Sequence, residues 1–115
     1  MVGALRKHAP VLRAMANCSP AMRKGMVKAA DPSLVRCLCE CALNILKGNV
    51  PLSPTHKRSL GRRKKDLRAL ASRRGSITGK KRILQKGGFI GSLLAALGTL
   101  LPIGRTITKA FSGKS

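Results

Sequence analysis

Positive charge is concentrated in the middle of this chain, and this segregation limits what the chain can fold into. Residues 57–86 hold 13 of the 24 Lys and Arg residues, with Asp66 as their only acid. A segment with so much charge of one sign repels itself and is stabilised when a polyanion neutralises it. The following 18 residues, 87–104, carry no charge at all. We therefore expect a basic segment that faces a polyanion, joined to an apolar segment with a different role.

The composition excludes most enzyme classes. The chain has 115 residues, a formal net charge of +21, three acids, two His and no Trp or Tyr. A chain of this length builds one small domain at most. Three carboxylates, Asp31, Glu40 and Asp66, allow at most one acid–base pair and no carboxylate cage for a hard cation. His8 and His56 have no nucleophile–acid pattern near them in the sequence. We expect no enzymatic activity, no cofactor and no small-molecule substrate.

The polyanion expected from the charge is double-stranded DNA, recognised through its phosphates. Without Trp and Tyr the chain lacks the aromatic rings on which single-stranded bases stack. Contacts to the phosphate backbone are largely blind to sequence. An anionic membrane surface and a merely solvated basic face are the alternatives. The side chains expected to contact phosphates are Arg62, Arg63, Lys64, Lys65, Arg68, Arg73, Arg74, Lys80, Lys81 and Arg82.

Three pairs of a capping residue and a proline predict helix starts. Ser19-Pro20, Asp31-Pro32 and Ser53-Pro54 each place an N-cap residue before a proline suited to the first helical position. The helices expected from these starts and from the apolar spacing cover 20–30, 32–47 and 54–73. A first helix over 2–15 is expected to break or kink at Pro10, and a weaker one is expected over 77–85.

These elements predict an all-α fold with three parts. Residues 1–52 form a small, loosely packed helical module, 53–86 a basic DNA-binding helical arm, and 87–115 a Gly-rich hydrophobic tail with an apolar helix, part of the chain being disordered. Leu38, Ile45 and Leu67 are expected in one small core, because they lie on the apolar stripes of two neighbouring helices.

The apolar tail has three possible fates that the sequence leaves open. It could lie in a membrane interface, pack inside the fold, or span a bilayer, although about 20 apolar residues are needed for a span. In the membrane alternative the basic arm binds anionic lipid and the tail inserts. The residues expected to contact the membrane are Phe89, Ile90, Leu93, Leu94, Leu97, Leu100 and Leu101.

The cysteines and one serine offer weaker signals. Cys37 and Cys41 share a helix face while Cys39 points away from it, and a structural zinc site needs four convergent ligands, so we expect no metal. Cys41 is expected in the core; the thiol state of the four cysteines is left open. Ser76 follows two arginines, as in a basophilic kinase site, but it is equally well placed to cap the helix expected over 77–85.

The order of a basic block, Gly87-Gly88 and an apolar tail resembles the precursor of adenovirus core protein X, also called mu. The matching stretch runs from Lys80 through Gly88 to Pro102. In that family a basic segment condenses viral DNA, and a Gly-Gly site for the viral cysteine protease precedes a hydrophobic piece. The resemblance implies possible cleavage after Gly88. The family's protease usually favours Met, Ile or Leu three residues before the second Gly, where this chain has Gln85.

A longer run, residues 40–53, resembles the small basic protein of Polinton/Maverick elements and their adintovirus relatives. Asn49-Val50-Pro51-Leu52-Ser53 is its most specific part, and the similarity extends over roughly residues 34–104. The resemblance implies a virion core protein that binds and condenses double-stranded viral DNA, with capsid proteins and the viral cysteine protease as partners. It implies location in the virion and the host nucleus, for which Arg62–Lys65 and Lys80–Arg82 offer nuclear-import-like patches.

Overall fold

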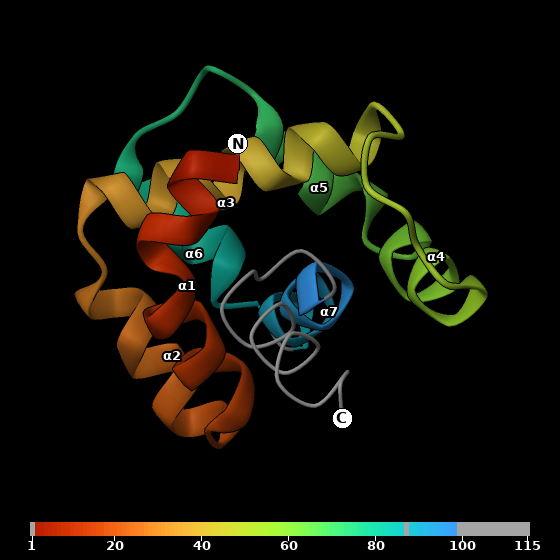
Figure 1. Cartoon of the computed structure of the whole chain (residues 1–115). Helices are drawn as coiled ribbons and strands as arrows, with labels where there is room; N and C mark the ends of the chain where they lie inside the picture. The colour runs from red at the N-terminus through yellow and green to blue at the C-terminus, as the bar shows by residue number, and fades with distance from the viewer. Residues whose placement is uncertain (1, 87, 99–115) are drawn as a thin grey trace, which may run out of the picture.

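The computed structural model describes residues 2–86 and 88–98, and these residues form seven α-helices and no strand (Figure 1). The helices are α1 (Val2–Asn17), α2 (Pro20–Ala29), α3 (Pro32–Leu46), α4 (Pro54–Gly61), α5 (Lys64–Ala71), α6 (Ile77–Leu84) and α7 (Phe89–Leu97). The expected all-α class is confirmed. The disorder expected for part of the chain, and the positions of Leu100 and Leu101, lie outside the described residues.

The helix starts follow the sequence closely. The side chains of Ser19, Asp31 and Ser53 each accept a hydrogen bond from the backbone N–H three residues further on, and a proline occupies the first turn each time. Ser76 caps α6 in the same way, at 3.0 Å from the N–H of Gly79. These four caps satisfy backbone donors that a helix start leaves without a partner. Pro10 does not break the first helix: α1 continues through it to Asn17.

The single helix expected over 54–73 is wrong, because two helices replace it. α4 ends at Gly61, and α5 begins at Lys64 after a turn through Arg62 and Arg63. Gly61 is a poor helix former, and four consecutive cations repel one another, so a helix is costly there. The turn also separates two packing partners: α4 packs mainly on α7, while α5 packs mainly on α3.

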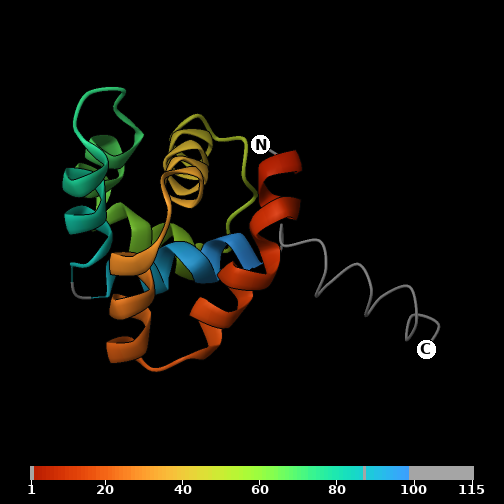
Figure 2. The same ribbon diagram turned by 90° about the vertical axis from the view of Figure 1, so that its left-hand side faces the viewer.

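Helix α7 lies in the middle of the molecule. Figure 2 shows it crossing the centre, and it contacts α1, α4 and α6. Its side chains are the most apolar of any helix, and six of its nine residues are buried. The buried residues are Phe89, Ile90, Leu93, Leu94, Ala96 and Leu97. Internal packing, one of the three alternatives left open by the sequence, is therefore what the structure shows for this part of the tail.

One hydrophobic core combines helices from all three expected parts. Leu12 of α1, Leu38 of α3, Leu70 of α5 and Leu93 of α7 are each at most 1 % exposed and belong to the same cluster. The boundaries expected near residues 52 and 86 thus do not separate independent cores. Residues 53–86 pack onto α3 and α7 as part of the fold, not as a projecting arm.

Replacement of Leu38 by Ala tests the core between α3 and α5. Leu38 is 1 % exposed, and Leu67 across from it on α5 is 3 % exposed. Removing a fully buried leucine side chain leaves a cavity, so Leu38→Ala should lower the free energy of unfolding by about 2–5 kcal/mol. Met22→Ala is the control, because Met22 is 64 % exposed and its loss should change stability by no more than about 0.5 kcal/mol. Urea unfolding followed by circular dichroism measures both, and equal effects would contradict the core.

Candidate nucleic-acid interface

Nine of the ten side chains expected to contact phosphates are exposed or partly exposed. They lie on the turn after α4, on α5, on the loop after α5 and on α6, and five of the nine are on the two helices. Because Leu67 and Leu70 turn inward to the core, the cations on the rest of α5 face outward. The nine are Arg62, Arg63, Lys64, Lys65, Arg68, Arg73, Arg74, Lys81 and Arg82.

Lys80 is the exception, and the structure removes it from the phosphate-contacting set. Its side chain is only 6 % exposed. The ammonium group donates hydrogen bonds to the carbonyls of Ala69 at 2.7 Å, Leu70 at 3.0 Å and Ser72. These carbonyls end α5, where a helix leaves acceptors unsatisfied and its dipole favours a cation. Lys80 therefore fixes the end of α5 and the loop that carries Arg73 and Arg74.

Two of the three acids, Asp31 and Asp66, are engaged in interactions of their own. Asp66 accepts a hydrogen bond from Lys86 at 2.8 Å in an ion pair. Asp31 caps α3, 2.8 Å from the N–H of Leu34. Glu40 lies on the exposed side of α3 and lines a pocket together with Arg73 and Lys80. The one acid within α5 and α6 is therefore paired with Lys86, and the two helices carry an excess of positive charge.

Gly88 begins α7 in a left-handed backbone conformation, with φ of 78°. L-residues with a side chain rarely adopt this conformation. A Cβ added here would also lie only 3.0 Å from an Nη atom of Arg63. Gly88 thus has a structural role in turning the chain into the core. Of the two residues expected at a protease site, Gly87 lies outside the described residues, and cleavage after Gly88 stays a prediction.

Arg23 of α2 holds three helices together, a role that the sequence did not suggest. Its guanidinium donates to the carbonyls of Met15 at 2.7 Å and Cys18 at 3.0 Å, at the end of α1. The same group lies against α7, where a Cβ on Gly91 would be 2.9 Å from an Nη atom. Gly91 is needed for this close approach. The charge of Arg23 is consequently used inside the fold.

The residues expected to contact a membrane lie in the core where they are described. Phe89, Leu93 and Leu97 have no measurable exposure, and Leu94 and Ile90 are 1 % and 6 % exposed. Membrane contact by these side chains would require α7 to leave the fold. None of the helices in the described ranges is both long and apolar enough to cross a bilayer.

The four cysteines are free thiols in the structure. Cys41 is buried, as expected, and so is Cys37 one turn before it, whereas Cys39 is partly exposed. The hydrogen bond between Cys37 and Cys41 lowers the pKa of Cys37 and, together with burial, raises the pKa of Cys41. Burial also raises the pKa of Cys39, against the opposing charge of Lys80. Within the described residues no group of three or more His, Cys, Asp or Glu side chains could hold a metal ion.

A buried polar pair joins α1 to the first turn of α3. His8, 8 % exposed, lies with its Nε2 atom 3.0 Å from Oγ of Ser33. The pair satisfies a histidine that would otherwise be buried without a partner. Sequence reasoning missed it because 25 residues separate the two.

The comparisons with known proteins add no relative. No protein-family profile, curated protein or solved structure matches this chain. The resemblance to adenovirus and Polinton proteins thus stays a prediction, and the case for a function depends on the residues themselves.

Substitutions of the neighbouring cations Lys80 and Arg82 should distinguish a role in the stability of the fold from a role in DNA binding. Lys80→Met leaves the carbonyls at the end of α5 without a donor and should cost about 1–3 kcal/mol of stability. It should not change the salt dependence of DNA binding. Arg82→Met, on the exposed side of the same helix, should have little effect on stability and should reduce the salt slope by about 0.9. Thermal unfolding and DNA titrations at several salt concentrations measure the two effects, and a normal melting temperature for Lys80→Met would contradict the assigned role.

Proposed function

We propose that this protein binds double-stranded DNA without sequence preference and condenses it as a core protein of a virus-like particle. The binding surface comprises the nine exposed or partly exposed cations of the turn before α5, of α5, of α6 and of the loop between these two helices, with Lys80 excluded. Each contact to a phosphate releases condensed counterions, which provides most of the binding free energy. We expect no side chain of this surface to form hydrogen bonds with base edges, so the same surface should bind a duplex of any sequence.

The observation that carries this proposal is the outward display of nine cations on α5, on α6 and on the turns that flank α5. The chain has three acids for its 24 Lys and Arg residues, and one of these acids, Asp66, pairs with Lys86. Side chains on packed helices lose less backbone freedom on binding than side chains on a flexible arm. A fold that keeps so much unneutralised charge is best explained by a polyanionic partner.

Burial of α7 favours DNA binding over membrane activity. The buried apolar side chains of this helix stabilise the fold of the free protein, as Phe89 and Leu93 illustrate. The basic surface needs no such rearrangement to meet a phosphate backbone. We therefore keep lipid binding as an outcome of the tests and not as a second proposal.

The virion role comes from the resemblance of residues 34–104 and 80–102 to viral and transposon-encoded basic proteins. On that proposal the protein acts in the virion and in the host nucleus, beside capsid proteins and a viral cysteine protease. A net charge of +21 matches the phosphates of only about ten base pairs. Condensation of a genome would accordingly use many copies of the chain.

The full chain should bind any duplex DNA with a steep salt dependence. If about 6–10 phosphates are engaged, affinity should fall roughly 10³–10⁵-fold between about 50 and 200 mM salt. Fluorescence anisotropy with duplexes of unrelated sequence measures this, with anionic and neutral vesicles as comparison ligands. A strong preference for one sequence, or an affinity that barely changes with salt, would contradict the proposal.

Cleavage after Gly88 should remove the core helix and not release a folded basic domain. Chains ending at residue 88 and at residue 98 have the same 21 Lys and Arg and 3 acids, a net charge of +18. Only the shorter chain lacks α7. Burial of each large apolar side chain contributes about 1.5–3 kcal/mol, so five such losses rival the whole stability of a small domain, about 5–15 kcal/mol.

Circular dichroism and thermal unfolding compare the two truncated chains. Chain 1–98 should unfold cooperatively, and chain 1–88 should lose helicity and its cooperative transition while still binding DNA. Two equally stable chains would contradict the central role of α7. Terminal sequencing of the protein from purified particles would show whether cleavage after Gly88 occurs.

A further inference from the structure

A groove lined by cations runs between α6 and α2, and the sequence suggested no DNA contact for α2. It has a volume of about 590 Å³, and no acid lines it. Lys24 and Lys28 line it from α2, and Lys81 and Arg82 line it from α6. Lys24 and Lys28 are exposed, one helical turn apart on the same face. Two pairs of cations thus face each other from helices that are more than 50 residues apart in sequence.

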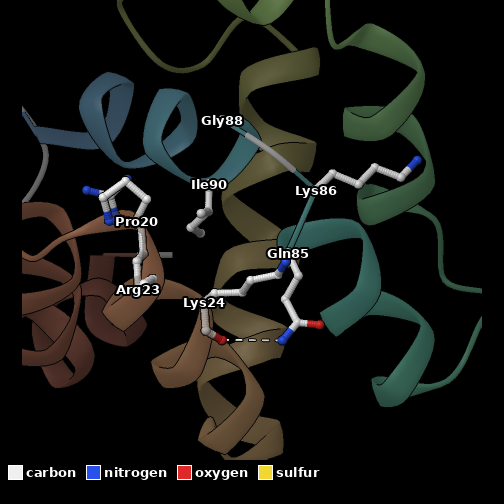
Figure 3. A pocket seen from close by; sticks show the side chains of 8 residues that line it. Pro20, Arg23, Lys24, Gln85, Lys86, Gly88 and Ile90 are labelled. Carbon is white, nitrogen blue, oxygen red and sulfur yellow. Dashed lines mark hydrogen bonds between the residues drawn. The ribbon is translucent and has the colours of Figure 1, made fainter.

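Two hydrogen bonds hold the walls of the groove together. Lys81 donates from Nζ to the carbonyl of Lys28 at 2.9 Å, and Gln85 donates from Nε2 to the carbonyl of Lys24 at 3.3 Å. Figure 3 shows Gln85 reaching from α6 to α2 in the adjoining pocket, which shares Ala21, Lys24 and Gln85 with the groove. The backbone carbonyls accept these bonds, so the ammonium groups of Lys24 and Lys28 are not consumed by them. An ammonium has three donors, so Lys81 retains two for a ligand.

The α2 side of the groove contains residues with little or no side chain. Ala21 lines the groove one helical turn before Gly25, which lies between Lys24 and Lys28, and a Cβ added at Gly25 would meet no atom within 4 Å. A ligand can therefore approach the α2 backbone closely between Lys24 and Lys28. In the adjoining pocket Lys86 points away from the groove, toward its ion pair with Asp66 (Figure 3). Because no acid lines the groove, an outside anion can neutralise its cations.

We infer that this groove holds the phosphodiester backbone of one strand of the bound duplex, with Lys24 and Lys28 as phosphate contacts. This inference rests on the proposed function and extends it from α5 and α6 to α2. Successive phosphates of one DNA strand form a row of anions. The four cations on the two facing walls of the groove can contact this row. The groove continues the basic surface, because Lys81 and Arg82 belong to both.

The test compares two double variants of the full chain that remove the same charge. Lys24→Gln/Lys28→Gln removes both groove lysines and leaves their backbone carbonyls in place. Arg6→Gln/Lys7→Gln removes two exposed cations of α1 that do not line the groove. The first variant should lower the slope of log affinity against log salt by about 1.8, and the second should leave it close to the wild-type value.

A second pair of variants blocks the groove without changing charge. Gly25→Gln adds a side chain where the structure has open space, whereas Gly3→Gln adds the same side chain to an exposed position of α1. Gly25→Gln should bind duplex DNA more weakly than wild type at every salt concentration, and Gly3→Gln should bind as wild type does. Circular dichroism should show both variants folded, because glutamine favours a helix over glycine.

The outcomes separate this inference from the proposed function. If the groove and α1 double variants change the slope equally, or if Gly25→Gln binds normally, the groove holds no strand and the inference is overturned while wild-type DNA binding stands. If the groove variants change binding to anionic vesicles but not to DNA, the inference is also overturned. If wild type fails to bind duplex DNA at all, the proposed function itself is wrong.

Discussion

The burial of α7 against α1, α4 and α6 is the interaction on which the rest of the structure depends. A chain with a net charge of +21 is driven to expand by its own repulsion. Folding requires a large apolar surface to oppose this, yet most helices here offer only one narrow apolar stripe. α7 is apolar on nearly every side, so several helices can bury their stripes on it at once. The cations then remain on the outer surfaces of these helices.

Much of the fold follows from local sequence signals. Ser19, Asp31 and Ser53 mark helix starts because capping depends on a few consecutive residues, and these are visible in the sequence. Leu38, Ile45 and Leu67 reach the core because their helices are amphipathic with one clear apolar face. Signals of this kind need no knowledge of which helix packs on which.

Predictions from the sequence were wrong or incomplete where the role of a residue depends on its neighbours in the folded chain. α7 has no polar face, so periodicity could not distinguish a buried helix from one in a membrane. Lys80 was counted as one more cation, although its spacing from Ile77 and Leu84 places it on the inward face of α6. That spacing was a usable signal. For Lys24 and Lys28 no signal existed, because only folding brings α2 beside α6.

Self-repulsion links the stability of this fold to its proposed partner. A ligand that binds only the folded chain stabilises it by mass action, and a polyanion also removes repulsion among the cations that it neutralises.

Simple salt acts in two opposing ways: it screens repulsion in the free protein, yet it weakens the contacts to DNA by reducing the gain from counterion release. At low salt the free fold is therefore at its least stable and its affinity for DNA is greatest. Two hydrogen bonds from lysines to carbonyls near helix ends, Lys81 to Lys28 of α2 and Lys80 to Leu70 of α5, counter this repulsion, because the helix dipoles favour cations there. Part of the positive charge thus stabilises the fold, and the remainder is left exposed for phosphates.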